Sequence, residues 1–263
     1  MLQLTNIYKT FNVGTPDERS VFGNFDFYVK KGDFVTLVGG NGSGKSTLFN
    51  LIAGVLLPDA GSIVLDGTDI TTMLEHKRAQ MVGRIFQDPL KGTAPNMTVE
   101  ENLAIAYMRS TGRSFFSRVS KKDKTYLRER VAQLGMGLED RMGAQVGLLS
   151  GGQRQAMTLS MATLVTPRLL LLDEHTAALD PVSAEKIMNL TRDIVAEQQI
   201  TTIMITHNLS SAIETGNRII MLDTGKIVVD IAGERRRRLT VKELLEIFQQ
   251  ASRKEFDSEL ALH

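Results

Sequence analysis

One eight-residue stretch decides the fold: Gly39-Gly40-Asn41-Gly42-Ser43-Gly44-Lys45-Ser46, which fits the pattern G-x-x-x-x-G-K-[ST]. The run 33–38 before it predicts a short strand, and helical periodicity follows from Lys45 to about Gly54. Glycines let consecutive backbone N–H groups point at phosphate oxygens, and the helix N-terminus adds its dipole. In this pattern the lysine reaches the β- and γ-phosphates and the following hydroxyl binds Mg²⁺. The stretch therefore predicts a nucleotide site; a glycine-rich turn before a helix is the alternative.

Two acids follow an apolar run later in the chain. Leucines fill 169–172 and are followed by Asp173 and Glu174, as expected of a buried parallel strand. Ligands bind at the carboxyl ends of such strands. Asp173 is then expected to approach the Mg²⁺ that Ser46 binds, and Glu174 is a candidate to orient and deprotonate an attacking water. The alternative is an ordinary strand end whose acids cap the next turn.

A third motif, Leu149-Ser150-Gly151-Gly152-Gln153, stands just before a predicted helix over about 153–165. Serine is a favoured N-cap residue, and two glycines permit a close backbone approach to a bulky anionic group. A helix N-terminus with a hydroxyl group binds anions. The sequence thus predicts two phosphate-binding helix ends.

Composition excludes several classes of protein. The chain has 263 residues, of which 42% are hydrophobic and 23% charged, so it is neither wholly disordered nor collagen-like. It has no cysteine, which excludes disulfides, thiol catalysis, iron–sulfur clusters and Cys-type zinc sites. The net charge of +1 weighs against a dedicated nucleic-acid binder. The strongest apolar run, 169–172, is too short to cross a bilayer. Because the first residues also lack a signal-peptide pattern, we expect a cytosolic location.

Strands that alternate with helices predict an α/β fold with a largely parallel sheet. Residues from about 88 to 149 are predicted to be a mostly helical insertion, in which Thr98 and Glu101 form a capping box. A basic stretch, 109–124, contains Phe115-Phe116. The predicted strands cover 2–8, 21–29, 33–38, 63–65, 168–172, 201–206, 218–222 and 226–229; further helices cover about 125–134, 183–198 and 241–253.

The three motifs together resemble the nucleotide-binding subunit of ATP-binding cassette (ABC) transporters. The 39–46 stretch is similar to that family's Walker A, 149–153 to its signature and 169–174 to its Walker B. The resemblance covers about 2–229 and implies a P-loop NTPase (RecA-like) core with an N-terminal antiparallel β subdomain and an inserted α-helical subdomain. It implies an ABC ATPase domain over 1–232, with the helical subdomain at about 88–149, and a helical tail over 233–263.

The resemblance also implies individual roles. Gln87 matches the Q-loop glutamine, which contacts Mg²⁺ and the attacking water, Asp180 the D-loop aspartate at the dimer interface, and His207 the switch histidine at the γ-phosphate. Phe11 is similar to the aromatic residue under the adenine ring; a core phenylalanine is the alternative. The expected catalytic residues are Glu174, His207 and Gln87, and the expected Mg²⁺ ligands are Ser46, Gln87 and Asp173. The expected nucleotide-binding residues are Phe11, Gly39, Asn41, Gly42, Ser43, Gly44, Lys45, Ser46, Thr47, Ser150, Gly151, Gly152, Gln153 and Asp180.

Two features depart from the family pattern. His175 stands where the family has proline, and we interpret it as a local loop variant rather than a ligand. The polar loop from Asn12 to Arg19 is longer than in many relatives. A third feature, Arg235–Arg238, has no assigned role, and solvated surface is the expectation for it.

The resemblance implies an ATPase with ATP and Mg²⁺ as cofactors that forms a head-to-tail dimer. It implies a peripheral subunit at the cytoplasmic face of the membrane, with a permease partner, an external substrate-binding protein and no nucleic acid. We expect a bacterial importer, with aromatic or branched-chain amino acids among the candidate substrates. The alternatives are a split exporter or lipid-extraction ATPase, and a soluble ABC ATPase, which would carry tandem cassettes or a long coiled coil.

Overall fold

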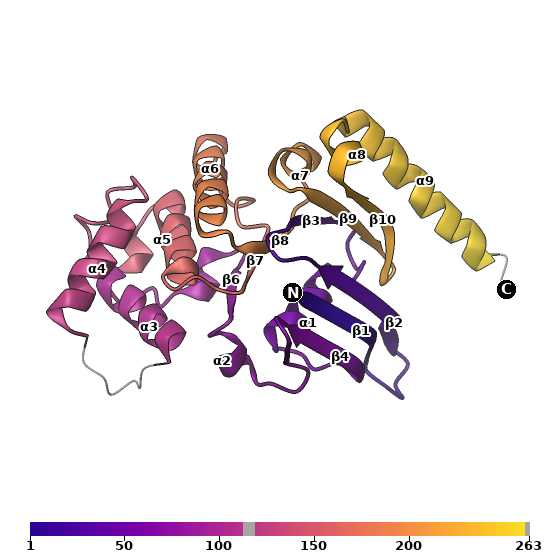
Figure 1. Cartoon of the computed structure of the whole chain (residues 1–263), viewed down its shortest axis with the longest axis horizontal. Helices are drawn as coiled ribbons and strands as arrows, with labels where there is room; N and C mark the ends of the chain where they lie inside the picture. The colour runs from indigo at the N-terminus through magenta and orange to yellow at the C-terminus, as the bar shows by residue number, and fades with distance from the viewer. Residues whose placement is uncertain (113–118, 261–263) are drawn as a thin grey trace. The chain divides into compact units, whose positions relative to one another are not determined.

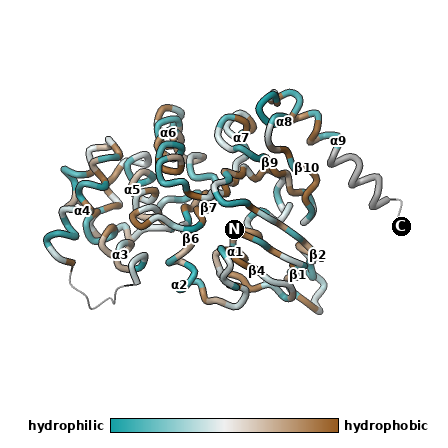
Figure 2. The backbone as a smooth tube through the Cα atoms, viewed as in Figure 1, coloured by the Kyte–Doolittle hydropathy of each residue, from teal (hydrophilic) through white to brown (hydrophobic). Residues whose placement is uncertain are grey.

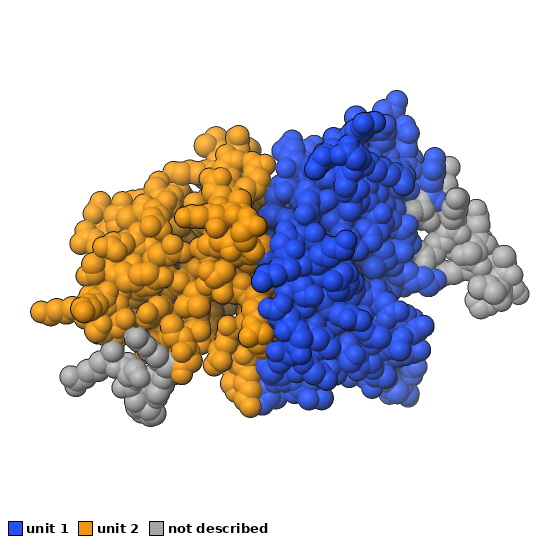
Figure 3. All heavy atoms as spheres, in the orientation of Figure 1, with its two compact units in different colours: residues 1–75, 201–263 blue, residues 76–200 orange. Residues whose placement is uncertain are grey.

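The chain folds into two compact units in the computed structural model, which describes residues 1–112 and 119–260 (Figure 3). Unit 1 comprises Met1–Glu75 and Thr201–His263, and unit 2 comprises His76–Ile200. Phe115-Phe116, in the basic stretch, lie outside the described residues. No helix in the described part of the chain is long and apolar enough to span a membrane.

Unit 1 contains a four-stranded antiparallel sheet in the order β2-β1-β4-β5, of which Figure 1 labels β2, β1 and β4. Its strands are β1 (Leu2–Phe11), β2 (Arg19–Val29), β4 (Ala60–Leu65) and β5 (Thr68–Asp69). Alternation buries Leu2 and Leu4 of β1, and an irregularity between Leu4 and Ile7 shifts the register so that Ile7 is buried as well. The expected N-terminal antiparallel β subdomain is confirmed.

Unit 1 also carries strands of the α/β core. β3 (Phe34–Val38) pairs in parallel with β8 (Thr201–Ile205) and β9 (Arg218–Asp223), and β10 (Lys226–Ala232) pairs antiparallel with β9. Every residue of β3 and β8 is buried, as expected of parallel strands covered on both faces. Helix α1 (Lys45–Ala53) follows β3, and α7 (Leu209–Thr215), absent from our predictions, packs on β3.

The C-terminal tail packs onto this part of unit 1. Helix α8 (Gly233–Arg237) and helix α9 (Val241–Leu260) follow β10, and Leu239 and Leu244 join the apolar cluster of β9 and β10. In Figure 2, β9 and β10 are coloured mainly hydrophobic, and the adjacent α8 is coloured hydrophilic. Helix α9 runs past the predicted end at residue 253. The expectation of solvated surface is wrong for Arg236, whose guanidinium is half-buried and donates to the Ile213 carbonyl oxygen.

Unit 2 combines two parallel strands with helices. β6 (Val82–Ile85) pairs with β7 (Leu169–Asp173). The helices are α2 (Glu75–Arg78), α3 (Val99–Thr111), α4 (Lys121–Ala132), α5 (Gly151–Thr163) and α6 (Pro181–Gln198), with short 3₁₀ helices at Pro89–Gly92 and Val146–Leu148. Leucine, valine and methionine side chains of α3, α4 and α5 form one apolar cluster, which Ile187 of α6 completes.

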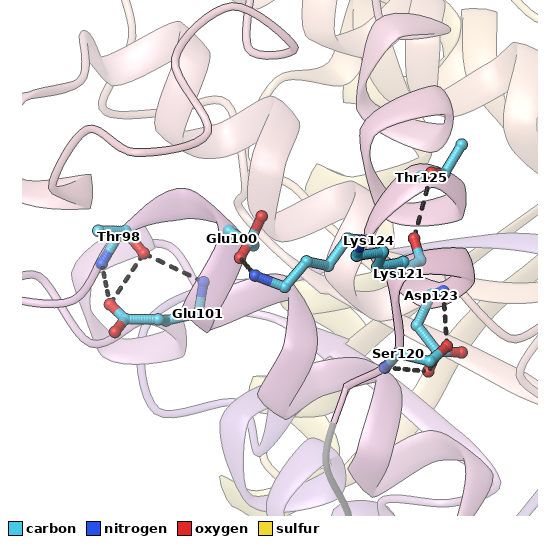
Figure 4. Close-up of polar contacts among 8 residues, drawn as sticks. All are labelled: Thr98, Glu100, Glu101, Ser120, Lys121, Asp123, Lys124 and Thr125. Carbon is cyan, nitrogen blue, oxygen red and sulfur yellow. Dashed lines mark hydrogen bonds and ion pairs between the residues drawn. The ribbon is translucent and has the colours of Figure 1, made fainter.

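Capping boxes begin the two helices of the predicted insertion (Figure 4). The Thr98 hydroxyl accepts from the Glu101 amide while the Glu101 carboxylate accepts from the Thr98 amide, which confirms this predicted start. Ser120 and Asp123 form a second box, so α4 begins at Lys121 and the predicted start at residue 125 is wrong. An ion pair of 2.5 Å between Lys124 Nζ and Glu100 Oε1 links α4 to α3.

Candidate functional site

The phosphate loop lies between buried β3 and helix α1, as predicted. Gly39, Gly42 and Gly44 have φ of +153°, +81° and +105°, values that only glycine adopts at little cost. At Gly39 a side chain is also excluded sterically, since a Cβ would lie 2.2 Å from the Leu222 carbonyl oxygen. Gly39 therefore serves both the turn and its close packing against β9.

One side chain and one backbone amide, from α1 and from the β9–β10 turn, hold carbonyl groups of the loop. The buried Lys45 ammonium donates to the carbonyl oxygens of Gly39, at 2.8 Å, and Gly40, at 2.7 Å. The Gly225 amide, in the β9–β10 turn, donates to the Ser43 carbonyl at 3.1 Å. Ser46 is exposed and Thr47 half-buried in the first turn of α1, while Asn41 is exposed in the loop. Hydrogen bonds from Lys45 and Gly225 thus hold the loop backbone, while the Asn41 and Ser46 side chains are exposed.

The acidic end of β7 also has the predicted form. Asp173 ends β7, and Arg84 on β6 forms an ion pair with it at 3.7 Å. Glu174 follows with φ of +46°, a left-handed conformation that is uncommon for a residue with a side chain. Gln87 Nε2 donates to Glu174 Oε2 at 3.3 Å. Unit 2 therefore brings together Asp173, Glu174 and Gln87, three predicted site residues.

His175 points into the interior of unit 2. Its side chain is 2% exposed, and Nε2 lies 3.1 Å from Thr191 Oγ1 on α6. With the Thr191 hydroxyl donating to the Ile187 carbonyl oxygen at 2.8 Å, the Nε2–H tautomer of the imidazole donates to Thr191 Oγ1. Burial lowers the pKa of His175 to about 4. The imidazole is thus neutral at pH 7 and occupied with α6, in agreement with a local loop variant.

The signature motif begins helix α5. Ser150 is the N-cap and Gln153 its capping-box partner, as the serine predicted. Gln153 is further fixed by bonds from Arg141 Nη1 to its Oε1 at 3.0 Å and from its Nε2 to the Met136 carbonyl at 3.1 Å. The first turn of α5 is therefore rigidly positioned, with the Ser150 hydroxyl at an exposed helix end.

The two signature glycines permit a close approach within unit 2. A Cβ at Gly151 would lie 3.2 Å from Leu179 Cδ2, and one at Gly152 would lie 3.2 Å from Ser183 Oγ. Asp180 is the N-cap of α6 and accepts from the Ser183 amide at 3.0 Å. Hydrogen bonds from Ser183, side chain and backbone, lower the pKa of Asp180. The signature and the predicted D-loop are thus neighbours.

Phe11 and His207 belong to unit 1. Phe11 is the last residue of β1 and half-buried, with Lys9 Nζ 5.6 Å from its ring centroid. His207 is exposed just after β8, before Asn208 caps α7. Sequence reasoning missed two loop contacts, those of Gly225 and Arg19; the Arg19 Nη2 donates to the Gly42 carbonyl at 2.9 Å. Only the Asp223–Gly225 turn had a visible sequence signal.

Comparisons with known proteins agree with this geometry. The model of the ABC transporter family matches residues 22–177. A tyrosine transport ATP-binding protein of Clostridioides difficile (strain R20291) is 43% identical, over 95% of this chain and 100% of that protein. A lipoprotein-releasing system ATP-binding protein of Rhodopseudomonas palustris (strain ATCC BAA-98 / CGA009) is 34% identical, over 86% and 98%. A dimeric, post-hydrolysis structure of the ATP-binding cassette MJ0796 with ADP and Pi matches with a TM-score of 0.75 and 27% identity, over 91% of this chain and 100% of that chain.

The resemblance and the P-loop fold are thereby confirmed. A family match over more than half of the chain, relatives aligned over nearly their full length and a solved cassette of the same fold all agree. The chain belongs to the ABC transporter family, as an ATP-binding subunit that hydrolyses ATP.

Proposed function

We propose that this chain powers the import of an amino acid, with tyrosine and its aromatic relatives as the first candidates. The observation that carries the proposal is the 43% identity to a tyrosine transport ATP-binding protein, which extends over that protein's whole length. The partners are a permease and an external substrate-binding protein, so the chain works as a peripheral subunit at the cytoplasmic face of the membrane. The nearly balanced charge, 31 basic against 30 acidic residues, supports the absence of a nucleic-acid partner.

The ATPase domain comprises 1–232, with the helical insertion at about 88–149, and 233–263 form a tail. The phosphates of ATP replace the Gly39 and Gly40 carbonyls as acceptors of the Lys45 ammonium, and the loop amides and α1 supply further donors. Phe11 stacks on the adenine. The remaining contacts come from Gly39, Asn41, Gly42, Ser43, Gly44, Ser46 and Thr47 of the same copy, and from Ser150, Gly151, Gly152, Gln153 and Asp180 of a second copy.

The donor set suits Mg²⁺ in a site completed by nucleotide. The described residues contain no group of three or more His, Asp or Glu that could hold a metal by themselves. One carboxylate, one hydroxyl and one amide, from Asp173, Ser46 and Gln87, are hard oxygen ligands of the kind that Mg²⁺ combines with phosphates and waters. The ion, when bound, neutralises charge on the β- and γ-phosphates.

Glu174 is the general base in this proposal. Its carboxylate accepts from the Gln87 amide at 3.3 Å, so both side chains face one position where a water can be oriented and deprotonated. His207 contacts the γ-phosphate and stabilises its charge. Two copies in head-to-tail arrangement enclose two ATP molecules, and loss of the γ-phosphate reopens the dimer, which gives a two-state element able to drive a permease.

Glu174→Gln separates binding from hydrolysis. We expect the variant to bind ATP with unchanged affinity, to hydrolyse it at least about a hundredfold more slowly and to accumulate as an ATP-bound dimer in size-exclusion chromatography. The matched control is Glu185→Gln, which removes an exposed carboxylate on α6 and should leave hydrolysis unchanged. Hydrolysis at the wild-type rate in Glu174→Gln would refute the role of Glu174.

Uptake assays test the direction and the substrate class. Cells that lack the chain are expected to lose uptake of labelled tyrosine and to regain it with the wild-type chain but not with Glu174→Gln. The second candidate function is extraction or export, which the 34% identity to a lipoprotein-releasing subunit favours. Unchanged tyrosine uptake with lipoproteins retained in the inner membrane would support that function and refute import.

A further inference from the structure

Arg19 is the first residue of β2, at the end of the polar loop that departs from the family pattern. It pairs directly across the strands with Phe11. Directly opposite residues of an antiparallel pair point to the same face, with Cβ atoms about 5 Å apart. The arginine and the proposed adenine-stacking ring therefore share one face of the β1–β2 hairpin.

The guanidinium of Arg19 reaches the phosphate loop. Nη2 donates to the Gly42 carbonyl oxygen at 2.9 Å, and a Cβ at Gly42 would lie 2.8 Å from the same nitrogen. In a trans peptide the carbonyl and the following amide point in opposite directions. Consistently, the Ser43 amide is directed into the loop, toward the Gly40 carbonyl at 3.4 Å. The contact with Arg19 thus holds this peptide with its amide inward.

Most of the hydrogen-bonding capacity of Arg19 remains available. A guanidinium has five N–H donors, and the bond to Gly42 uses one of them. The residue is exposed and makes no ion pair with a carboxylate in the described part of the chain. The neighbouring cation Lys9 differs, because its ammonium is paired with Asp59 at 2.6 Å. Arg19 therefore has further N–H donors available at the Gly42 side of the loop.

Two cationic side chains contact different carbonyl groups of the loop. Lys45 lies at Gly39 and Gly40, and Arg19 lies at Gly42, beside the strand partner of Phe11. A nucleotide with its base on Phe11 and its terminal phosphates at Lys45 has its α-phosphate on the Arg19 side. We propose that Arg19 is a nucleotide-binding residue, whose guanidinium holds the Gly42 peptide and donates to the α-phosphate of the bound nucleotide. The inference rests on the proposed nucleotide contacts of Phe11 and Lys45.

Folding does not depend strongly on this residue. A single hydrogen bond from an exposed side chain to a backbone carbonyl contributes little net stability, so Arg19 variants are expected to fold. Arg19→Gln keeps an N–H donor for Gly42 and removes the charge. Arg19→Lys keeps the positive charge but loses the planar guanidinium, which can donate two parallel hydrogen bonds to a phosphate. Arg238→Gln, at an exposed position of the same unit, is the matched control.

Calorimetric titration with ATP and with ADP, at low and high salt, tests the proposal on the whole chain. For Arg19→Gln we expect about tenfold weaker binding of both nucleotides, as for loss of one charge-assisted contact, with a smaller difference from wild type at high salt. The nucleotide affinity of Arg19→Lys should lie between those of the wild type and Arg19→Gln, and the affinity of Arg238→Gln should equal that of the wild type. The thermal midpoints of all variants should equal that of the wild type.

Three results would overturn the assignment. Wild-type affinity of Arg19→Gln for ATP would remove Arg19 from the site while the proposed function stands. A loss confined to ATP, with ADP unaffected, would move the contact to the γ-phosphate. A fall in the thermal midpoint that matches the loss of affinity would make the residue structural. Failure of the wild-type chain itself to bind ATP is distinguishable, because it refutes the proposed nucleotide site as a whole.

Discussion

We expect His175 to make the free energy of unfolding fall at acidic pH, and we expect the substitution His175→Gln to remove this contribution. The imidazole is buried and neutral, and burial lowers its pKa from 6.5 to about 4. In the unfolded chain the same group binds a proton below about pH 6.5. Between these two pKa values the unfolded state carries more protons than the folded state, so the free energy of unfolding falls as the pH falls.

The magnitude follows from the two pKa values. The contribution to stability is nearly constant above pH 7, and the full loss, reached below pH 4, is about 3 kcal/mol. Between pH 7 and pH 5 the loss is about 2 kcal/mol, an appreciable part of the stability of an ordinary domain. A working range of pH 5 to 7 therefore samples most of the effect while the carboxylates remain ionised.

Urea unfolding of the wild type and of His175→Gln at pH 5, 6 and 7 measures the effect. Glutamine keeps an N–H donor that can reach Thr191 Oγ1 but does not titrate. The other three histidines and all carboxylates are common to both proteins, so they cancel in the difference. We expect the wild type to lose about 2 kcal/mol more than the variant between pH 7 and pH 5. Equal losses in the two proteins would refute a neutral, buried imidazole at this position.

Two further predictions concern unit 1. Gly225→Ala should destabilise the protein by more than about 3 kcal/mol in thermal unfolding, because its Cβ would lie 1.8 Å from the Val21 carbonyl oxygen. The control Gly14→Ala, at a similar φ of +75° with open space around it, should cost only about 1 kcal/mol. Equal costs for the two variants would contradict the close packing of the β9–β10 turn. Phe11→Ala should weaken ATP binding about tenfold in calorimetry while Phe11→Tyr preserves it, and unchanged binding by Phe11→Ala would place the adenine elsewhere.

Local sequence patterns were sufficient for the two helices that follow the phosphate loop and the signature motif. Each of these two motifs couples a strand or a cap to a helix within a few residues, so its geometry is set by neighbours in the chain. The Ser150 cap and the start of α1 at Lys45 therefore follow from residue types alone. The same logic applies to the start of β1, where alternation correctly indicates that Leu2 and Leu4 are buried, but the irregularity before Ile7 has no such signal.

Contacts between distant segments were not predictable in this way. Arg19 reaches Gly42 only because the register of β1 with β2 places it opposite Phe11. Arg236 reaches the Ile213 carbonyl because the chain turns from β10 into α8, and nothing in four consecutive arginines indicates which one is half-buried. Helix α7 is a single short segment, below the length at which periodicity is informative.

The sequence around Glu174 shows how a departure from a family pattern can be accommodated. Three consecutive polar residues have three different surroundings: Asp173 is ion-paired with Arg84, Glu174 accepts from Gln87, and His175 is buried against α6. The left-handed backbone at Glu174 costs about 1 kcal/mol. It is sustained by its surroundings, and the neighbouring imidazole, buried and hydrogen-bonded to Thr191, is one such constraint. The histidine beside the proposed general base is therefore an anchor, because its ring is buried and its Nε2 is hydrogen-bonded to Thr191 Oγ1.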